Sequence, residues 1–135
     1  MPEKYTKIFN VVAGARDAAV DYLVNSFASG KPVRGCDVDD VSRKFIADAG
    51  YGEYFIHRTG HSITEDLHGS GANLDNLETR DERSIIPETS FSVEPGIYMM
   101  GEFGIRSEID VYITKDRKVV VPGEPRQTAV VAILK

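Results

Sequence analysis

The stretch His57-Arg58-Thr59-Gly60-His61-Ser62-Ile63 is the most informative part of this sequence, because ordered motifs of the same chemical character follow it. His68 comes next, then Glu94 within VEPG, then Glu108 within IRSE. Imidazole nitrogens and carboxylate oxygens are ligands that suit manganese, cobalt, iron or zinc. One histidine with two carboxylates can occupy one face of such an ion, so the sequence predicts a metal site.

The composition is that of one ordinary globular unit. The chain has 135 residues, 41% hydrophobic and 27% charged, which is enough for one core of modest size. Its formal net charge of -5 argues against a nucleic-acid partner, which would favour a basic surface. No apolar run is long enough to span a bilayer and no signal segment is recognisable, so we expect no membrane partner and a cytoplasmic location. Cys36 is the only cysteine, which excludes an internal disulfide.

Two amphipathic helices are predicted in the first 50 residues. Over residues 4–29 the apolar positions recur every three or four residues and form one stripe: Ile8, Val12, Ala15, Ala19, Leu23 and Phe27. Gly30 is expected to end this helix. Asp37 is expected to be the N-cap of the second helix, with Asp39 and Asp40 as acids of its first turn. Its buried face is predicted to be Val38, Val41, Phe45, Ile46 and Ala49, and Gly50 should end it.

The second half of the sequence is rich in β-branched and aromatic residues, which is typical of strands. Strands are predicted at residues 55–63, 90–99, 105–114, 119–121 and 129–134. Residues 115–118 should form a hairpin turn, and residues 69–84 a surface loop beside a cleft. The expected fold class is therefore α+β, with two helices followed by an antiparallel curved sheet.

Strand alternation predicts where the two motif glutamates point. Glu94 should share a face with Ser92, and Glu108 should share one with Arg106, so that carboxylates on neighbouring strands meet across the cleft. A half-buried carboxylate needs a cation. Either a metal ion or Arg106 could be the partner of Glu94.

The ordered motifs resemble those of the M24 metallopeptidases, the "pita-bread" family, and most closely its Xaa-Pro dipeptidase (prolidase) and aminopeptidase P branch. That branch has a His-Arg-Thr-Gly-His segment, a further His, a Val-Glu-Pro-Gly-Ile-Tyr strand and a Gly-Ile/Val-Arg-x-Glu strand. All four occur here in order across most of the chain, and PRQT at residues 125–128 is similar to the family's last motif. The resemblance implies that residues 1–135 are a single partial catalytic domain, the C-terminal half of a pita-bread (creatinase/aminopeptidase) fold.

The resemblance also implies a role for each motif residue. His61, Glu94 and Glu108 match metal ligands, and Glu108 matches the carboxylate that bridges two ions. His57 and His68 match catalytic histidines that handle substrate and protons, and Arg106 matches a supporting cation. The implied cofactor is a divalent metal, Mn or Co first and Zn or Fe as alternatives. The implied reaction is hydrolysis of the peptide bond next to proline, in a proline-containing peptide, by a metal-bound hydroxide.

Two further ligands of the family are aspartates well upstream of the first histidine, and no residue here lies far enough upstream to match them. A pair of ions about 3.5–4 Å apart needs those charges. We therefore expect the retained ligands to hold one ion weakly or none, and the isolated chain to be inactive. An unpaired sheet edge should also make the chain associate, as a homo-oligomer or with the missing N-terminal half.

Departures from the family pattern lie beside the motifs. The usual Gly-His-Gly-Ile-Gly run is Gly60-His61-Ser62-Ile63-Thr64 here, Gly69 stands where an acid follows the later His, and Ile109 replaces an acid after Glu108. These departures bear on the substrate rather than on the metal ligands. Two alternatives stay open: a non-catalytic pita-bread binding module, and a metal-free creatinase-like hydrolase.

Overall fold

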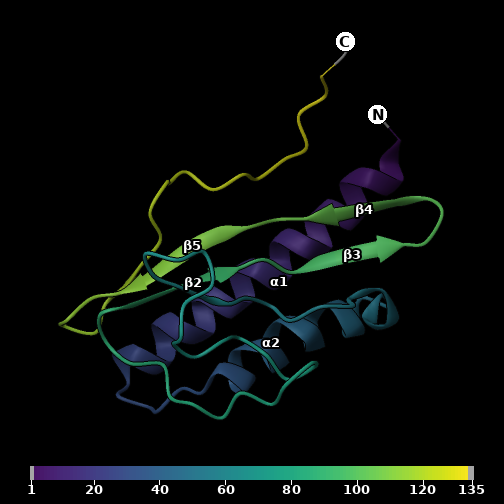
Figure 1. Cartoon of the computed structure of the whole chain (residues 1–135). Coiled ribbons are helices and arrows are strands. Elements are labelled where there is room, and N and C mark those ends of the chain that lie inside the picture. The colour runs from purple at the N-terminus through teal and green to yellow at the C-terminus, as the bar shows by residue number, and fades with distance from the viewer. Residues whose placement is uncertain (1, 134–135) are drawn as a thin grey trace.

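The computed structural model describes residues 2–133. Its elements, in chain order, are α1 (Glu3–Ala28), α2 (Gly35–Asp48), the short 3-10 helix η1 (Gly52–Tyr54), β1 (Ser62–Ile63), β2 (Thr89–Val93), β3 (Gly96–Met99), β4 (Phe103–Arg106), β5 (Ile109–Ile113) and β6 (Val119–Val120). In Figure 1, α1 runs behind the strands and α2 lies beside it. Within the described part, no helix combines the length and the apolar character needed to cross a membrane.

The first helix confirms the predicted stripe. All six apolar positions of the stripe are buried, and the helix packs against β2, β3, β4 and β6 as well as α2. It ends at Ala28, where Gly30 follows with a φ of +72°, a conformation that glycine adopts without strain. The spacing of apolar residues could be followed over the 26 residues of this helix, which is why it predicted the helix accurately.

The second helix begins three residues earlier than predicted, at Gly35, and its N-cap is Arg34, so the assignment of Asp37 as N-cap is wrong. Asp37 lies in the first turn, and its carboxylate accepts the backbone N–H of Arg34 at 3.1 Å. A side-chain hydrogen bond from the Arg34 guanidinium lowers the pKa of Asp37. Of the predicted buried face, Val38 and Ile46 are buried and Val41 is half-buried, whereas Phe45, 41% exposed, and Ala49 are not part of it. The fully buried Asp39 was not expected there.

The strands form two antiparallel sheets, with order β1-β2-β5-β6 in one and β3-β4 in the other. The predicted strands 90–99 and 105–114 are each broken, at Glu94-Pro95 and at Ser107-Glu108. Pro95 has no N–H to continue a ladder, and its carbonyl instead accepts Ser107 N–H at 3.3 Å. Both motif glutamates therefore lie where the chain crosses from one sheet to the other.

The predictions for the remaining segments had mixed outcomes. The hairpin turn at 115–118 is confirmed, since β5 and β6 pair across it. Residues 55–63 are mostly irregular and enter the sheet only at β1, while residues 129–133 form no strand and residue 134 lies outside the described range. The segment 69–84 is irregular as expected, but Leu74 is buried in the core, so it is more than a surface loop.

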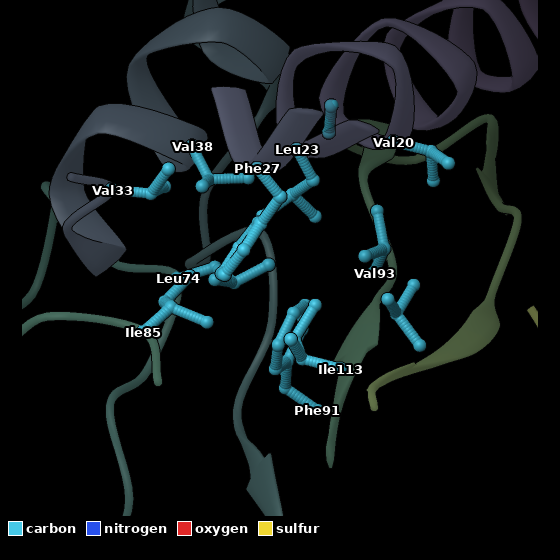
Figure 2. Packing of buried hydrophobic residues seen from close by; sticks show 12 residues of the cluster. Val20, Leu23, Phe27, Val33, Val38, Leu74, Ile85, Phe91, Val93 and Ile113 are labelled. Carbon is cyan, nitrogen blue, oxygen red and sulfur yellow. The ribbon is translucent and has the colours of Figure 1, made fainter. Parts of the chain in front are cut away.

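Two apolar clusters hold the layers together. The larger lies between the helices and the four-stranded sheet, and Figure 2 shows Val20, Leu23 and Phe27 of α1 meeting Phe91 and Ile113 of the strands. The smaller lies under β3 and β4 and contains Ile8, Val12, Ala15, Ile46, Phe55 and Ile97. The strand breaks that contain Glu94 and Glu108 lie between these two clusters. The packing on either side therefore fixes the position of the two glutamates.

The side chain of Asp81 holds the irregular segment 69–84 together and gives a first prediction. Its nearly buried carboxylate accepts the N–H groups of Asn73 at 2.8 Å and Arg83 at 3.1 Å, and a hydrogen bond from the Arg83 guanidinium lowers its pKa. A lowered folded-state pKa contributes stability above the ordinary value of 3.8, and this stability is lost as the pH falls further. We expect Asp81→Asn to lower the free energy of unfolding by about 1–3 kcal/mol at pH 7.

Urea unfolding at pH 7 and at about pH 3 measures this effect. The difference between the wild type and Asp81→Asn should shrink at the lower pH, because the wild-type carboxyl is then partly protonated. Glu82→Gln, at an exposed neighbouring carboxylate, should change stability by less than about 0.5 kcal/mol. An equal difference at both pH values would refute the role of the Asp81 charge.

Candidate functional site

One cleft of about 480 Å³ collects all the residues that the sequence singled out for chemistry. It is lined by His57, Arg58, His61, Leu67, His68, Glu78, Glu94, Arg106 and Glu108. The histidines come from the irregular segment before and after β1, Glu94 and Glu108 come from the two strand breaks, and Arg106 ends β4. The structure thus brings together residues separated by up to 51 positions in the chain.

The strand register explains why the two glutamates are neighbours. Val93 pairs with Ile109 at the end of β2 and β5, so the residues just beyond, Glu94 and Glu108, leave the sheet side by side. Arg106 pairs with Gly96 across β3 and β4. Its guanidinium lies between the carboxylates, with Nη1 3.2 Å from Glu94 Oε2 and Nη2 3.1 Å from Glu108 Oε2.

Glu94 is the more enclosed of the two acids, at 9% exposed. Its Oε1 accepts a hydrogen bond from Ser92 Oγ at 2.9 Å and lies 3.3 Å from His61 Nε2. The same Ser92 hydroxyl accepts the backbone N–H of His61 at 3.0 Å. Ser92 therefore links the carboxylate to the histidine segment, a role the sequence did not reveal beyond placing Ser92 on the face of Glu94.

The His61 ring is oriented by a contact of its Nδ1. This atom lies 3.1 Å from the backbone carbonyl oxygen of Ser62. A carbonyl can only accept, so Nδ1 carries a proton, and Nε2 faces the carboxylate of Glu94. Two acceptors at 3.3 Å need a cation between them, which is either a proton or a metal ion. The His68 ring contacts His61 edge-on, with the centroids 4.3 Å apart.

His57 is fixed from both ring nitrogens. Nδ1 donates to the Arg58 carbonyl at 2.7 Å, and Nε2 lies 2.8 Å from the Tyr98 hydroxyl. Burial raises the pKa of Tyr98, so its hydroxyl keeps its proton at neutral pH and donates to Nε2. Tyr98 ends the VEPGIY motif, yet nothing in the sequence indicated that it would reach a histidine 41 residues earlier.

The donor types in the cleft suit a divalent ion, but the side chains are arranged around a guanidinium. Among residues 2–133, no group of three or more His, Cys, Asp and Glu side chains is placed so that it could hold a metal ion. Arg106 supplies the positive charge for both glutamates instead. Arg106 is half exposed and can turn toward solvent, which would leave the His61 lone pair and the carboxylates facing one space.

The sequence and the fold of this chain are both similar to those of known proteins. The model of metallopeptidase family M24 matches residues 1–115. A Xaa-Pro dipeptidase of Lactobacillus delbrueckii subsp. lactis is 37% identical over 115 residues, which is 84% of this chain and 28% of that relative. The chain thus spans well under half the length of this relative.

Solved structures agree with the sequence relatives. The dipeptidase PepE of Mycobacterium ulcerans superposes with a TM-score of 0.79 at 30% identity, over 96% of this chain and 32% of that one. The X-Pro aminopeptidase of Thermotoga maritima gives 0.78 at 32% identity, over 96% and 34%. These matches confirm the α+β, pita-bread prediction, and with the family match they show that the chain belongs to metallopeptidase family M24.

Proposed function

We propose that this chain is the C-terminal catalytic-domain segment of a metal-dependent Xaa-Pro peptidase, which hydrolyses the peptide bond next to proline. The observation that carries the proposal is the His61–Glu94 contact, in which Nε2 lies 3.3 Å from a carboxylate oxygen in the same cleft as Glu108. This group of side chains needs positive charge, which Arg106 supplies in the structure and a divalent ion would supply in the proposal. The Xaa-Pro dipeptidase relative and the X-Pro aminopeptidase structure support the choice of substrate class.

In this proposal His61, Glu94 and Glu108 hold the divalent ion, manganese or cobalt in preference to zinc or iron. A bound ion of this kind polarises the scissile carbonyl and makes water a nucleophile at neutral pH. His57 Nε2 can take a proton from the reacting groups once substrate displaces the Tyr98 hydroxyl. His68, edge-on to His61, can donate to the carbonyl oxygen as negative charge develops there.

The isolated chain is proposed to have little or no activity. It spans 28% of the Lactobacillus relative, and no carboxylate outside the cleft residues reaches the His61–Glu94 pair in the described part. A partner is therefore part of the proposal: either the segment that carries the two upstream aspartates or a second copy of this chain. With a single ion the site has no second centre to steady the developing oxyanion.

Calorimetric titration of the metal-free chain with Mn²⁺ and Co²⁺ tests the proposal. We expect one ion to bind and Glu108→Ala to weaken binding by about tenfold or more, because a charged ligand is removed. Glu78→Ala is the matched control, since Glu78 is another cleft glutamate with no proposed ligand role, and it should leave binding unchanged. Absence of binding in the wild type would refute the proposal for this chain.

One observation favours the metal-free alternatives. Arg106 already neutralises Glu94 and Glu108, as a binding module or a creatinase-like hydrolase without metal would require. The same titration separates the two cases, because neither alternative needs a divalent ion. Wild-type binding that depends on Glu108 would exclude both of them.

A further inference from the structure

A buried ion pair on α2 lies directly beneath the histidine segment. Asp39 is 0% exposed, and its carboxylate accepts two bonds from Arg43, at 2.8 Å from Nε and 3.1 Å from Nη2. Asp39 Oδ1 also accepts the backbone N–H of Thr59 at 2.8 Å. The pair therefore contacts the chain between His57 and His61 rather than only its own helix.

The guanidinium of Arg43 extends these contacts. Nη1 donates to the Phe55 carbonyl and Nη2 to the His57 carbonyl, both at 2.9 Å. The guanidinium also stacks over the Phe55 ring, 4.3 Å from its centroid. Three backbone groups at residues 55, 57 and 59 are thus bonded to one ion pair.

Backbone pairing holds only the later part of this segment. Gly60 bridges to Leu74, the Thr59 carbonyl accepts the Glu94 N–H at 2.7 Å, and the His61 carbonyl accepts the Ser92 N–H at 2.9 Å. The buried Thr59 hydroxyl finds no partner among the described residues, so its side chain does not anchor the segment. The ion pair bonds the groups that this pairing leaves over, namely the Phe55 and His57 carbonyls and the Thr59 N–H.

We infer that Asp39 and Arg43 are a positioning pair for the two cleft histidines that flank Thr59. Arg43 fixes the His57 carbonyl, and this sets the ring where Nδ1 reaches the Arg58 carbonyl and Nε2 reaches Tyr98. Asp39 fixes Thr59, two residues before His61. The inference deepens the proposed function, since it names what orients the residues assigned there to metal and proton transfer.

The chemistry of the ion pair indicates a role in positioning the backbone, beyond any contribution to packing. A buried ion pair is often no more stabilising than apolar residues of similar volume, so stability alone does not explain its presence. A forked guanidinium, however, can hold one carboxylate and two carbonyls at fixed angles, which an apolar side chain cannot do. The pair thus fixes the segment at Phe55, His57 and Thr59, just before the backbone bonds to β2 begin.

Arg43→Lys tests the inference, because it keeps the positive charge but removes the planar guanidinium that bonds several acceptors at once. In ¹⁵N-labelled protein we expect the His57 ring nitrogens to change from one tautomer to a mixture, and Mn²⁺ affinity to fall by about tenfold. Lys44→Arg is the mirrored control: Lys44 is the next residue of the same helix and pairs with Asp48 on the surface. It should change neither readout.

The outcomes separate this inference from the proposed function. Wild-type ring signals that persist in Arg43→Lys would overturn the positioning role, whatever the metal does. If the wild type binds no Mn²⁺, the proposed function fails, and the ring signals alone decide the inference. If circular dichroism shows that Arg43→Lys is unfolded, Asp39→Asn provides the same test, since it keeps the size of the side chain and removes the charge. Unchanged His57 ring signals in Asp39→Asn would also overturn the positioning role.

Discussion

Replacing Phe91 with alanine should lower the free energy of unfolding by about 3–5 kcal/mol, the range found when a buried aromatic ring is deleted. Phe91 is 1% exposed in the middle of β2, where it pairs with Ser62 of β1 and Val111 of β5. Its ring belongs to the larger apolar cluster between α1 and the sheet (Figure 2). Equilibrium unfolding in urea measures the loss.

The control for this prediction is Ile86→Ala. Ile86 is a large apolar residue near the same sheet but is 56% exposed, so its removal should change stability by less than about 1 kcal/mol. The dependence of stability on urea should have the same slope in both variants if the surface exposed on unfolding is unchanged. Similar losses for Phe91→Ala and Ile86→Ala would mean that the larger cluster is not the main source of stability.

Long periodic patterns predicted the helical layer well. The stripe of α1 runs from Ile8 to Phe27, about five turns, so single exceptions do not alter the period, and every predicted position is buried. The shorter α2 was predicted less well, because Asp39 was taken for an exposed acid of the first turn. A carboxylate four residues before an arginine, as in Asp39 and Arg43, was the available signal, but that spacing is more often a surface pair.

The strand predictions failed where the motifs themselves interrupt the ladder. Residue type favoured continuous strands across both glutamates, since Val93 and Ile97 flank Glu94, and Ile105 and Ile109 flank Glu108. Pro95 breaks one strand by lacking a donor, and Ser107 turns toward Arg16 of α1 and breaks the other. The second of these causes is a contact between residues 91 positions apart, so sequence spacing could not reveal it.

Local motifs predicted most members of the cleft but none of its internal contacts. They identified the three histidines, Glu94, Arg106 and Glu108, but not Arg58, Leu67 and Glu78. The partners that orient them, Ser92, Tyr98 and Arg43, come from elements whose packing sets the distances. Arg106, which the sequence offered as one of two possible cation partners of Glu94, provides the charge in the structure.

Arg16 connects α1 to the strand break beside Glu108, and its replacement tests how much this contact contributes to stability. Its side chain is 1% exposed, and Nη1 donates to Ser107 Oγ at 2.7 Å and to the Gln127 carbonyl at 3.2 Å. Nε is bonded to Asp17 at 2.9 Å. A charged side chain in this position was not foreseen, because the helical stripe assigns burial to its apolar neighbours.

Arg16→Met should therefore lower the free energy of unfolding by about 3 kcal/mol: methionine fills much of the volume but leaves the Ser107 hydroxyl and the Gln127 carbonyl without their charged donor. Arg126→Gln is the matched control, since Arg126 pairs with the same Asp17 but is partly exposed, and it should cost less than about 1 kcal/mol. Both are measured by urea unfolding at neutral pH. If the two variants lose the same stability, the ion pair with Asp17 dominates, and the contact of Arg16 with the strand break beside Glu108 contributes little.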